Sequence, residues 1–391
     1  MGGTEVYVSS LVRELLALGI RSRVVLPEPD GGAFTSDLRT YPVNANLILD
    51  ELRLELPHLG FEHFVEHLKA APNAIYHQHS WTRGCGAHHL RAAREAGLRT
   101  ILTIHVPGNI CLRGTMALMG RQSCDGLVEE RRCGACWAQS RGIPTSAAGM
   151  VASLPLALAS RLRRSRGRLS TALSARALAA GKRAEVRDMV LNADKVVVVC
   201  KWLYDAMVRN GIDRTKLVLS RQGLPREFLV AAAGKSRLDG ERRGPLELLF
   251  LGRFHPVKGL DVVIKAIRAL PMETGVRLTV RAVAATEEEQ AYAAVLRAMA
   301  RGEPRIRFLE PASRRDVPDI LQAHDVLVVP STWLETGPLV VLEALATGTF
   351  VFGSDLGGIS ELIGGGDGGR LIPAGNVSAW SLAIAEMAAT P

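Results

Sequence analysis

The stretch Ser331-Thr-Trp-Leu-Glu-Thr-Gly-Pro-Leu-Val-Val-Leu-Glu-Ala-Leu-Ala-Thr-Gly348 places two carboxylates around the start of a helix. The apolar run before it, residues 326–330, predicts a buried parallel strand, and Pro338 suits the first turn of the helix that follows. We therefore expect Glu335 in the loop and Glu343 on the helix. Such a helix directs unpaired N–H groups to the sheet edge where open α/β folds bind anions. We expect a diphosphate as the ligand, and the adjacent carboxylates can accept hydrogen bonds from the hydroxyls of sugars attached to it.

The pattern formed by Glu335 and Glu343, with seven residues between them, resembles the signature of the retaining glycosyltransferase family 4. Residues 248–261, Leu-Leu-Phe-Leu-Gly-Arg-Phe-His-Pro-Val-Lys-Gly-Leu-Asp, are similar to the family's strand with its Gly-Arg and Lys-Gly pairs. Residues 357–363 resemble the loop and helix that close the donor half. The resemblance covers about residues 195–391. It implies an α/β chain of GT-B fold, in which two Rossmann-like domains with mostly parallel sheets face each other across a cleft.

The resemblance also implies roles for individual residues. Arg253 and Lys258 would hold the donor's diphosphate, Glu335 would touch the sugar, and Glu343 would touch the ribose. His105, directly after a predicted strand, would face the transferred sugar. An isolated glutamate is more often a solvated helix residue, and a lone histidine is more often structural, so each role has a structural alternative. We assign catalysis to His105, Glu335, Arg253 and Lys258, and donor binding to Gly3, Arg253, Lys258, Glu335, Thr336, Gly337, Pro338, Leu339 and Glu343.

These residues predict a retaining transfer from a nucleoside-diphosphate sugar, of UDP or GDP type, to a glycan, lipid-linked or small-molecule acceptor. Fixed cations and helix N–H groups stabilise the charge of a departing phosphate. No Asp-x-Asp triplet occurs in the chain, so we expect no cofactor for catalysis. Two alternatives remain open at this point. One is another GT-B enzyme, such as a sugar-nucleotide epimerase, and the other is a catalytically silent, zinc-stapled binding protein at a membrane surface.

Bulk composition fits an enzyme of two domains. The 391 residues exceed what one hydrophobic core usually serves, and 47% of them are hydrophobic. The net charge of +9 suits an acidic partner such as a nucleotide sugar, a lipid phosphate or an anionic membrane. We expect no nucleic-acid partner, although charge alone does not exclude one. No apolar run approaches the ~20 residues of a membrane span, and no signal sequence is evident. We therefore expect a cytoplasmic protein, with a peripheral position at the inner membrane face as an option.

Alternating helix and strand patterns define the expected domains. Residues 1–224 form the acceptor-side domain, 225–245 a linker, and 246–391 the donor domain. Gly3 resembles the family's glycine-rich loop, and we expect the strand that normally precedes this loop to be missing. We expect the same of the crossing helices that normally end the family's chains. Predicted strands are 22–26, 75–78, 100–104, 195–199 and 216–219 in the first domain, and 246–250, 278–283, 305–308, 325–329 and 350–352 in the second.

Four of the six cysteines cluster in a loop at about residues 106–140: Cys111, Cys124, Cys133 and Cys136. The last two have the Cys-x2-Cys spacing of a metal knuckle, and four thiolates suit tetrahedral zinc. The first interval is irregular, so free thiols, a disulfide and an iron–sulfur cluster stay open, and Cys85 is another ligand source. We predict a structural zinc site that takes no part in the chemistry.

A basic stretch follows the cysteines. Five arginines occur within eight residues, at positions 161, 163, 164, 166 and 168, beside the mostly apolar residues 154–159. Helical periodicity extends over about residues 155–190. A basic amphipathic helix on an anionic membrane is one interpretation, and a solvated basic face is an equal alternative.

Overall fold

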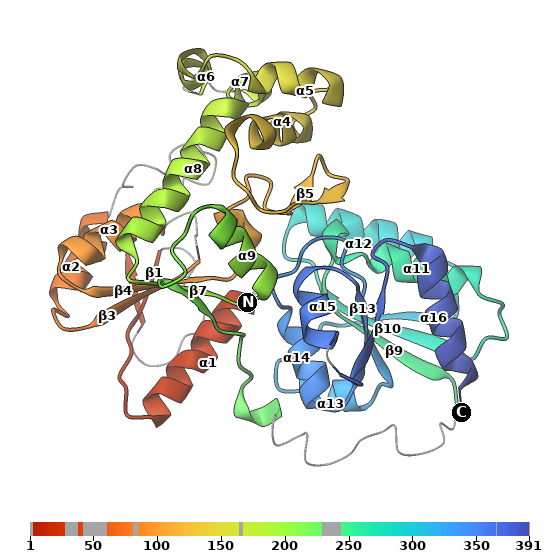
Figure 1. The fold of residues 1–391 in the computed structure, drawn as a ribbon. Coiled ribbons are helices and arrows are strands. Elements are labelled where there is room, and N and C mark those ends of the chain that lie inside the picture. Colours follow the sequence, from red (N-terminus) through yellow and green to blue (C-terminus); the bar gives the residue numbers. More distant parts are fainter. Residues whose placement is uncertain are drawn as a thin grey trace. The chain divides into compact units, whose positions relative to one another are not determined.

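In the computed structural model the chain divides into two compact units, Met1–Arg221 and Gln222–Pro391 (Figure 1). The structure describes residues 3–27, 38–41, 61–80, 85–163, 167–228, 244–364 and 366–390. Most of the predicted linker, residues 225–245, lies outside the described residues.

The second unit contains a six-stranded, entirely parallel sheet in the order β11-β10-β9-β12-β13-β14. Parallel sheets are covered on both faces, so their strands are apolar along their whole length. All four residues of β12 are buried. The bounds are β9 Leu246–Arg253, β10 Val276–Val283, β11 Ile306–Leu309, β12 Val326–Val329, β13 Phe350–Ser354 and β14 Gly369–Ile372.

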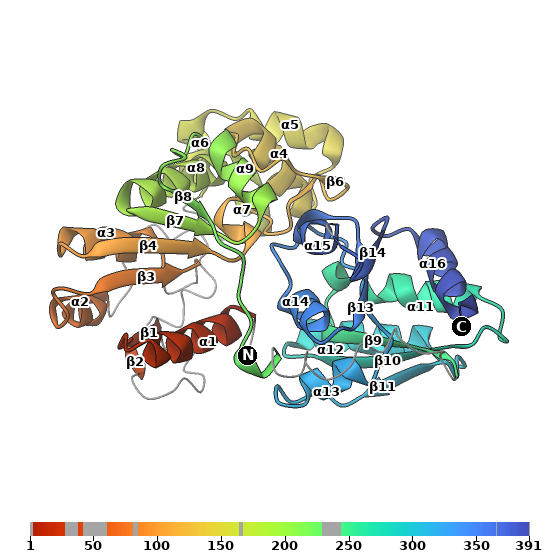
Figure 2. The same ribbon diagram turned by 60° about the horizontal axis from the view of Figure 1, so that its bottom comes forward.

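Helices cover both faces of this sheet (Figure 2). Alternate residues of β9 belong to opposite cores: Leu248 and Phe250 to one, Leu249 to the other. The first core is completed by α11 (Leu260–Ala269), α12 (Glu287–Met299) and α16 (Val377–Ala389), and the second by α13 (Val317–Gln322), α14 (Leu339–Ala346) and α15 (Gly357–Ile363).

The first unit is built on a four-stranded parallel sheet in the order β3-β4-β7-β8. A separate parallel pair, β1-β2, accompanies it. The strands are β1 Val24–Pro27, β2 Leu38–Tyr41, β3 Ile75–His79, β4 Arg99–Ile104, β7 Lys195–Val198 and β8 Leu217–Leu219, and the helices next to them are α1 Gly3–Ala17, α2 Phe61–Lys69, α3 Ala87–Glu95 and α9 Lys201–Arg209.

A helical subdomain consists of the long helix α8 and four shorter helices, α4 to α7, which group at one end of α8 (Figure 1). Small residues such as Ala138, Ala148 and Ala175 form its core together with Trp137. The basic stretch predicted at about residues 155–190 is therefore not one helix but three. These three are α6 Leu156–Leu162, α7 Arg168–Leu173 and α8 Ala175–Asn192, and the subdomain's other two helices are α4 Glu130–Ser140 and α5 Thr145–Ala152.

The α/β prediction is confirmed, and the ends of each predicted strand coincide with those of an observed strand to within three residues. The structure adds β2, the short hairpin β5 (Ala117–Leu118) with β6 (Gln122–Ser123), and β14. These strands are short and lack an apolar run, so their sequences carry little strand signal. Among the described residues, no helix has the length and apolar character needed to cross a bilayer.

Candidate functional site

An ion pair between Lys258 and Glu335 forms the centre of the candidate site in the second unit. Lys258 ends the short helix η5 (Pro256–Lys258) after β9, and Glu335 lies in the loop after β12. Nζ of Lys258 lies 2.6 Å from Oε1 of Glu335, and the hydroxyl of Ser331 donates to the same oxygen at 2.8 Å. Burial acts to raise the pKa of Glu335, but the charge of Lys258 and hydrogen bonds from Lys258 and Ser331 outweigh it, so the pKa is lowered overall. Glu335 is thus an ionised carboxylate.

A close approach of two loops brings this pair together. The N–H of Thr332 donates to the carbonyl of Val257 at 2.8 Å, which ties the loop after β12 to the segment that carries Lys258. Gly259 has a φ of +67°, and a Cβ at this position would lie 1.9 Å from the carbonyl oxygen of Pro330. Only glycine fits there. The two residues of the Lys-Gly pair therefore have different roles. Gly259 permits the close approach of the two loops, and Lys258 forms the ion pair with Glu335.

The glycine pair at the start of α15 covers the same loop. The N–H of Gly358 donates to the carbonyl of Glu335 at 2.7 Å. A Cβ on Gly358 would lie 2.7 Å from the backbone nitrogen of Gly337, and Gly357 has a φ of +56°. The third sequence motif therefore packs its backbone directly on the loop that carries Glu335.

The other residues assigned to donor binding gather at the start of α14. Thr336 and Gly337 end the loop and Leu339 begins the helix, while Pro338, which we predicted in the first turn, is the N-cap. Gly337 has a φ of +138°, a conformation that favours glycine. The backbone at this helix start is positioned to meet an anion.

Glu343 pairs with Arg314, a residue that sequence reasoning did not identify. Glu343 is 3% exposed on α14, and its Oε1 lies 2.5 Å from Nη1 of Arg314. Oε1 of Glu343 and Nη2 of Arg314 both lack a well-aligned hydrogen bond to the described residues, so the contact is an ion pair of imperfect geometry. Burial raises the pKa of Glu343, and Arg314 offsets only part of the effect. The Arg314 guanidinium also lies 4.8 Å above the ring of Phe228. Arg314 carries no motif that could have revealed it.

Arg253, the last residue of β9, is held by a second unpredicted partner, Glu289 on α12. Nη1 of Arg253 lies 3.1 Å from Oε1 of Glu289, while Oε2 of Glu289 accepts a hydrogen bond from the N–H of Ala285 at 2.8 Å. The hydroxyl of Thr286 accepts from the N–H of Glu289, which caps the helix. The Thr-x-x-Glu spacing is a capping signal that could have pointed to Glu289.

In the first unit, His105 lies in a cluster of aromatic rings at the carboxyl ends of β3 and β4. The strands pair in parallel with His79 opposite Thr103, so His79 and His105 meet at one edge of the sheet. Nδ1 of His79 lies 3.1 Å from Nε2 of His105. The ring of Tyr7, from α1, lies 4.9 Å from that of His105. Burial, with a smaller contribution from His77, lowers the pKa of His105 to about 4, so its imidazole is neutral at neutral pH.

His77 extends this histidine cluster, which consists of His77, His79 and His105. Its ring lies 4.0 Å from that of His79, and its Nε2 lies 2.7 Å from the hydroxyl of Thr103. Burial lowers the pKa of His77 to about 4 and lowers that of His79 as well. Gly3 begins α1, about one turn before Tyr7.

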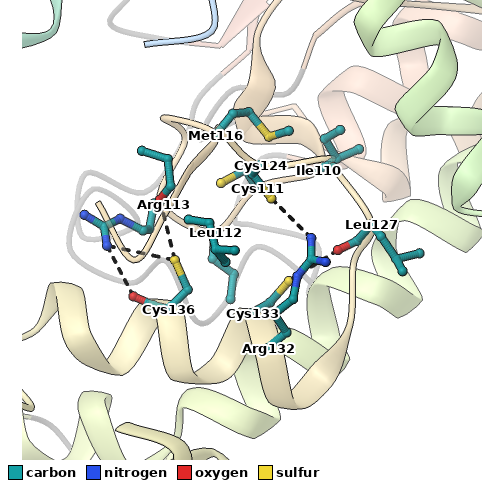
Figure 3. Close-up of a pocket in the computed structure, with 13 residues that line it drawn as sticks. Ile110, Cys111, Leu112, Arg113, Met116, Cys124, Leu127, Arg132, Cys133 and Cys136 are labelled. Atoms are coloured by element: carbon teal, nitrogen blue, oxygen red, sulfur yellow. Dashed lines mark hydrogen bonds between the residues drawn. The ribbon is translucent and has the colours of Figure 1, made fainter. Parts of the chain in front are cut away.

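The four clustered cysteines line one small cavity, which we name the thiol pocket (Figure 3). Its volume is about 30 Å³. Across the described ranges, no cysteine forms a disulfide and no three Cys, His, Asp or Glu side chains are arranged to hold a metal ion. The predicted zinc site is therefore not formed as such in the structure. The pocket is lined by Ile110, Cys111, Leu112, Arg113, Met116, Ala117, Leu118, Cys124, Gly126, Leu127, Arg132, Cys133 and Cys136.

Comparison with known families matches both halves of the chain. Residues 2–222 match the glycosyl transferase 4-like domain, and residues 237–391 match glycosyl transferases group 1.

Among curated proteins, the chain is 33% identical over 138 residues to D-inositol 3-phosphate glycosyltransferase of Mycobacterium ulcerans (strain Agy99), a match that covers 34% of the chain and 29% of that protein. The chain spans between 28% and 48% of the length of such relatives.

Solved structures resemble the whole chain. The Anabaena protein Alr3699/HepE in complex with UDP has a TM-score of 0.61 at 15% identity, with 98% of this chain and 85% of that chain covered. Sucrose-phosphate synthase (tll1590) from Thermosynechococcus elongatus has a TM-score of 0.60 at 18% identity, with 99% and 84% covered. Taken with the two parallel sheets and the three donor-side motifs, these matches show that the chain belongs to the glycosyl transferase 4-like family and has the GT-B fold.

Proposed function

We propose that the chain transfers a sugar from a nucleoside-diphosphate sugar to an acceptor, with retention of the anomeric configuration. The observation that carries the proposal is the Lys258–Glu335 pair. A cation that can meet diphosphate charge and an ionised carboxylate that can accept from sugar hydroxyls lie 2.6 Å apart at the carboxyl ends of neighbouring strands. Membership of a glycosyltransferase family supports the same reaction.

In this proposal the donor's diphosphate binds to Arg253, Lys258 and the backbone at the start of α14. Each cation already contacts a carboxylate of the protein, Glu289 or Glu335, so the phosphates add to preformed pairs and meet oriented side chains. Glu335 accepts from the sugar and Glu343 from the ribose. A UDP-type donor has the better support over GDP, since the Anabaena protein was solved with UDP and with UDP-glucose.

The chemical step needs no metal in this scheme. The acceptor oxygen bonds to the anomeric carbon as the bond from that carbon to the diphosphate breaks on the same face. The acceptor's proton passes to the departing phosphate oxygen. Arg253 and Lys258 stabilise the charge that grows on the phosphate, and His105, neutral because it is buried, hydrogen-bonds the transferred sugar.

The acceptor class is a glycan, a lipid-linked compound or a small molecule. Because curated relatives are named D-inositol 3-phosphate glycosyltransferase, an inositol phosphate belongs among the acceptors to be tested. A lipid-linked acceptor would suit a protein that works at the cytoplasmic face of a membrane. Two other functions compete with the proposal: a sugar-nucleotide epimerase, and a catalytically silent binding protein.

Mass spectrometry of products from a panel of nucleotide sugars and acceptors tests the proposal. We expect a glycosylated product with the donor's anomeric configuration by NMR, at a rate that excess chelator leaves unchanged. A product with altered sugar stereochemistry and no transfer would show an epimerase. The absence of any product across the panel would favour the binding protein.

Lys258→Ala and Arg253→Ala should each lower the turnover rate, on the order of 10²–10³-fold, because each removes a cation that stabilises the departing phosphate. Matched controls are Lys265→Ala and Arg277→Ala, which remove partly exposed cations of α11 and β10 from surface ion pairs. The controls should keep wild-type rates. Wild-type turnover of Lys258→Ala at saturating donor would contradict the diphosphate assignment.

A further inference from the structure

We propose that Cys111, Cys124, Cys133 and Cys136 bind one zinc ion within the thiol pocket. The site is separate from the proposed transfer reaction and does not depend on it. Four cysteines from three different segments line a single cavity, although up to 25 positions separate them in the sequence, from 111 to 136. Four thiolates around one ion are the usual ligand set of a closed structural zinc site.

Helix α4 supplies two of the ligands, and two other segments supply one each from the opposite wall (Figure 3). Cys133 and Cys136 stand three residues apart on α4, a spacing that places them on one face of the helix. Cys111 follows the short helix η3 (Pro107–Asn109), and Cys124 follows the hairpin β5–β6. A tetrahedral site with Zn–S bonds of about 2.3 Å requires the sulfurs to lie about 3.8 Å apart. Because no three Cys, His, Asp or Glu side chains among the described residues are arranged to hold a metal ion, zinc binding must draw the thiols inward from the walls.

Hydrogen-bond donors already point at three of the four sulfurs. The N–H of Met119 lies 3.2 Å from Sγ of Cys136, and the N–H of Glu129 lies 3.4 Å from Sγ of Cys133. Nη2 of Arg132 lies 3.4 Å from Sγ of Cys124. N–H groups that donate to a sulfur orient it as a metal ligand, which is the usual role of groups around a metal site.

Two arginines also line the pocket. A zinc ion with four thiolates has a net charge of −2, which a largely apolar cavity accommodates poorly without cations. Arg132 pairs with Asp125 and also reaches Cys124. Arg113 contacts only neutral oxygens and the sulfur of Cys136 among the residues that the structure describes. Arg113 therefore supplies an uncompensated positive charge beside one proposed ligand.

The walls of the pocket are anchored to the body of the first unit. The side chain of Asn210, the C-cap of α9, accepts from the N–H of Val128 at 2.9 Å and donates to the carbonyl of Gly126 at 2.8 Å. Cys111 lies six positions after His105. A zinc ion would consequently join the segment that follows the histidine cluster to α4 of the helical subdomain.

Elemental analysis of the full chain, expressed with zinc supplementation and purified under reducing conditions, tests the site. We expect about one equivalent of zinc, since closed structural sites bind with roughly 10–16 kcal/mol. Cys133→Ser/Cys136→Ser should lose the metal. Cys85→Ser, which changes a cysteine outside the pocket, should keep it. Less than about a tenth of an equivalent in the folded wild type, or full occupancy in the double variant, would overturn the proposal.

A measurement on the unaltered chain guards against variants that fail to fold. Replacement of the zinc by cobalt should produce the sulfur-to-metal charge-transfer bands and the intense visible bands of a tetrahedral thiolate site. Iron with sulfide, or a disulfide between pocket cysteines by peptide mass mapping, would each replace the zinc proposal.

Discussion

At the scale of single residues, the two glutamates that define the sequence signature have opposite electrostatic environments. Glu335 receives an ammonium and a hydroxyl at short range, and its pKa is lowered. Glu343 is equally buried but has one poorly aligned arginine, and its pKa is raised. The contrast suits the proposed division of roles, in which the ionised Glu335 accepts from hydroxyls of the transferred sugar and Glu343 accepts from hydroxyls of the ribose.

Substitutions at the two positions should separate the roles. Glu343→Gln should weaken binding of the free nucleoside diphosphate by about 1.5–3 kcal/mol, the usual value of a hydrogen bond to a charged group. Glu335→Gln should lower the turnover rate and leave that affinity nearly unchanged. Calorimetric titration with the product nucleotide measures both. Glu386→Gln, a partly exposed position paired with Arg370 on the same unit, is the control. Equal weakening in the two site variants would show that the division is wrong.

At the scale of elements, parallel pairing of β3 with β4 builds the histidine cluster. The rings of His77, His79 and His105 meet because the register aligns the ends of the two strands, and α1 adds Tyr7. Burial keeps all three imidazoles neutral, since each pKa is lowered. Neutral imidazoles can therefore hydrogen-bond to each other within the cluster. Protonation of two of them would place like charges side by side.

The free energy of unfolding of the first unit should consequently decrease at acidic pH. The pKa of His77 and of His105 falls from 6.5 to about 4 on folding, so between these values the unfolded chain binds protons that the folded chain does not. The contribution of the two neutral histidines to the free energy of unfolding should be complete above pH 6.5. It should fall as the pH decreases from 6.5 towards 4, by about 1.4 kcal/mol per pH unit for each histidine. Denaturant titrations should show a shallower fall in His77→Gln. An unchanged slope in that variant would contradict the assignment.

At the scale of the whole molecule, charge and exposed apolar side chains coincide on one subdomain. The chain has a net charge of +9. On α6, Leu156 and Leu158 are 41% and 44% exposed, and Arg161 lies on the same helix. Met150 on α5 and Leu169 on α7 are exposed further, at 70% and 66%. Basic residues beside exposed apolar side chains are the composition of a surface that rests on anionic lipid.

Flotation with vesicles that contain anionic lipid should detect such binding. Binding should weaken as salt shortens the screening length from about 10 Å at 0.1 M to about 3 Å at 1 M. Leu156→Ser/Leu158→Ser should reduce it further. Leu382→Ser, at an exposed apolar position of the second unit, should not. Equal flotation of both variants, or none with the wild type, would leave the basic stretch as an ordinary solvated face.

Periodicity determined the sheet-and-helix order, and the resemblance to glycosyltransferase family 4 supplied most of the donor-side residues. Buried parallel strands are apolar throughout, so their apolar runs can be recognised in the sequence. The loop around Glu335 requires glycines at positions 259, 337, 357 and 358, and these are visible as Lys-Gly, Thr-Gly and Gly-Gly pairs. His105 was identified from its place at the end of a strand, a place that the register confirms. Its role, like the roles of the other site residues, stays a prediction.

Only the tertiary structure revealed the partners. Glu289 reaches Arg253 across 36 positions, and Arg314 and His77 meet Glu343 and Thr103 across 29 and 26. The thiol pocket likewise exists only because a loop, a hairpin and a helix converge. Such contacts depend on which strands neighbour each other and in what register, and those are decided by burial of the whole core. A local pattern can show that a charged or aromatic side chain sits at a sheet edge, but its counterpart is chosen by the fold.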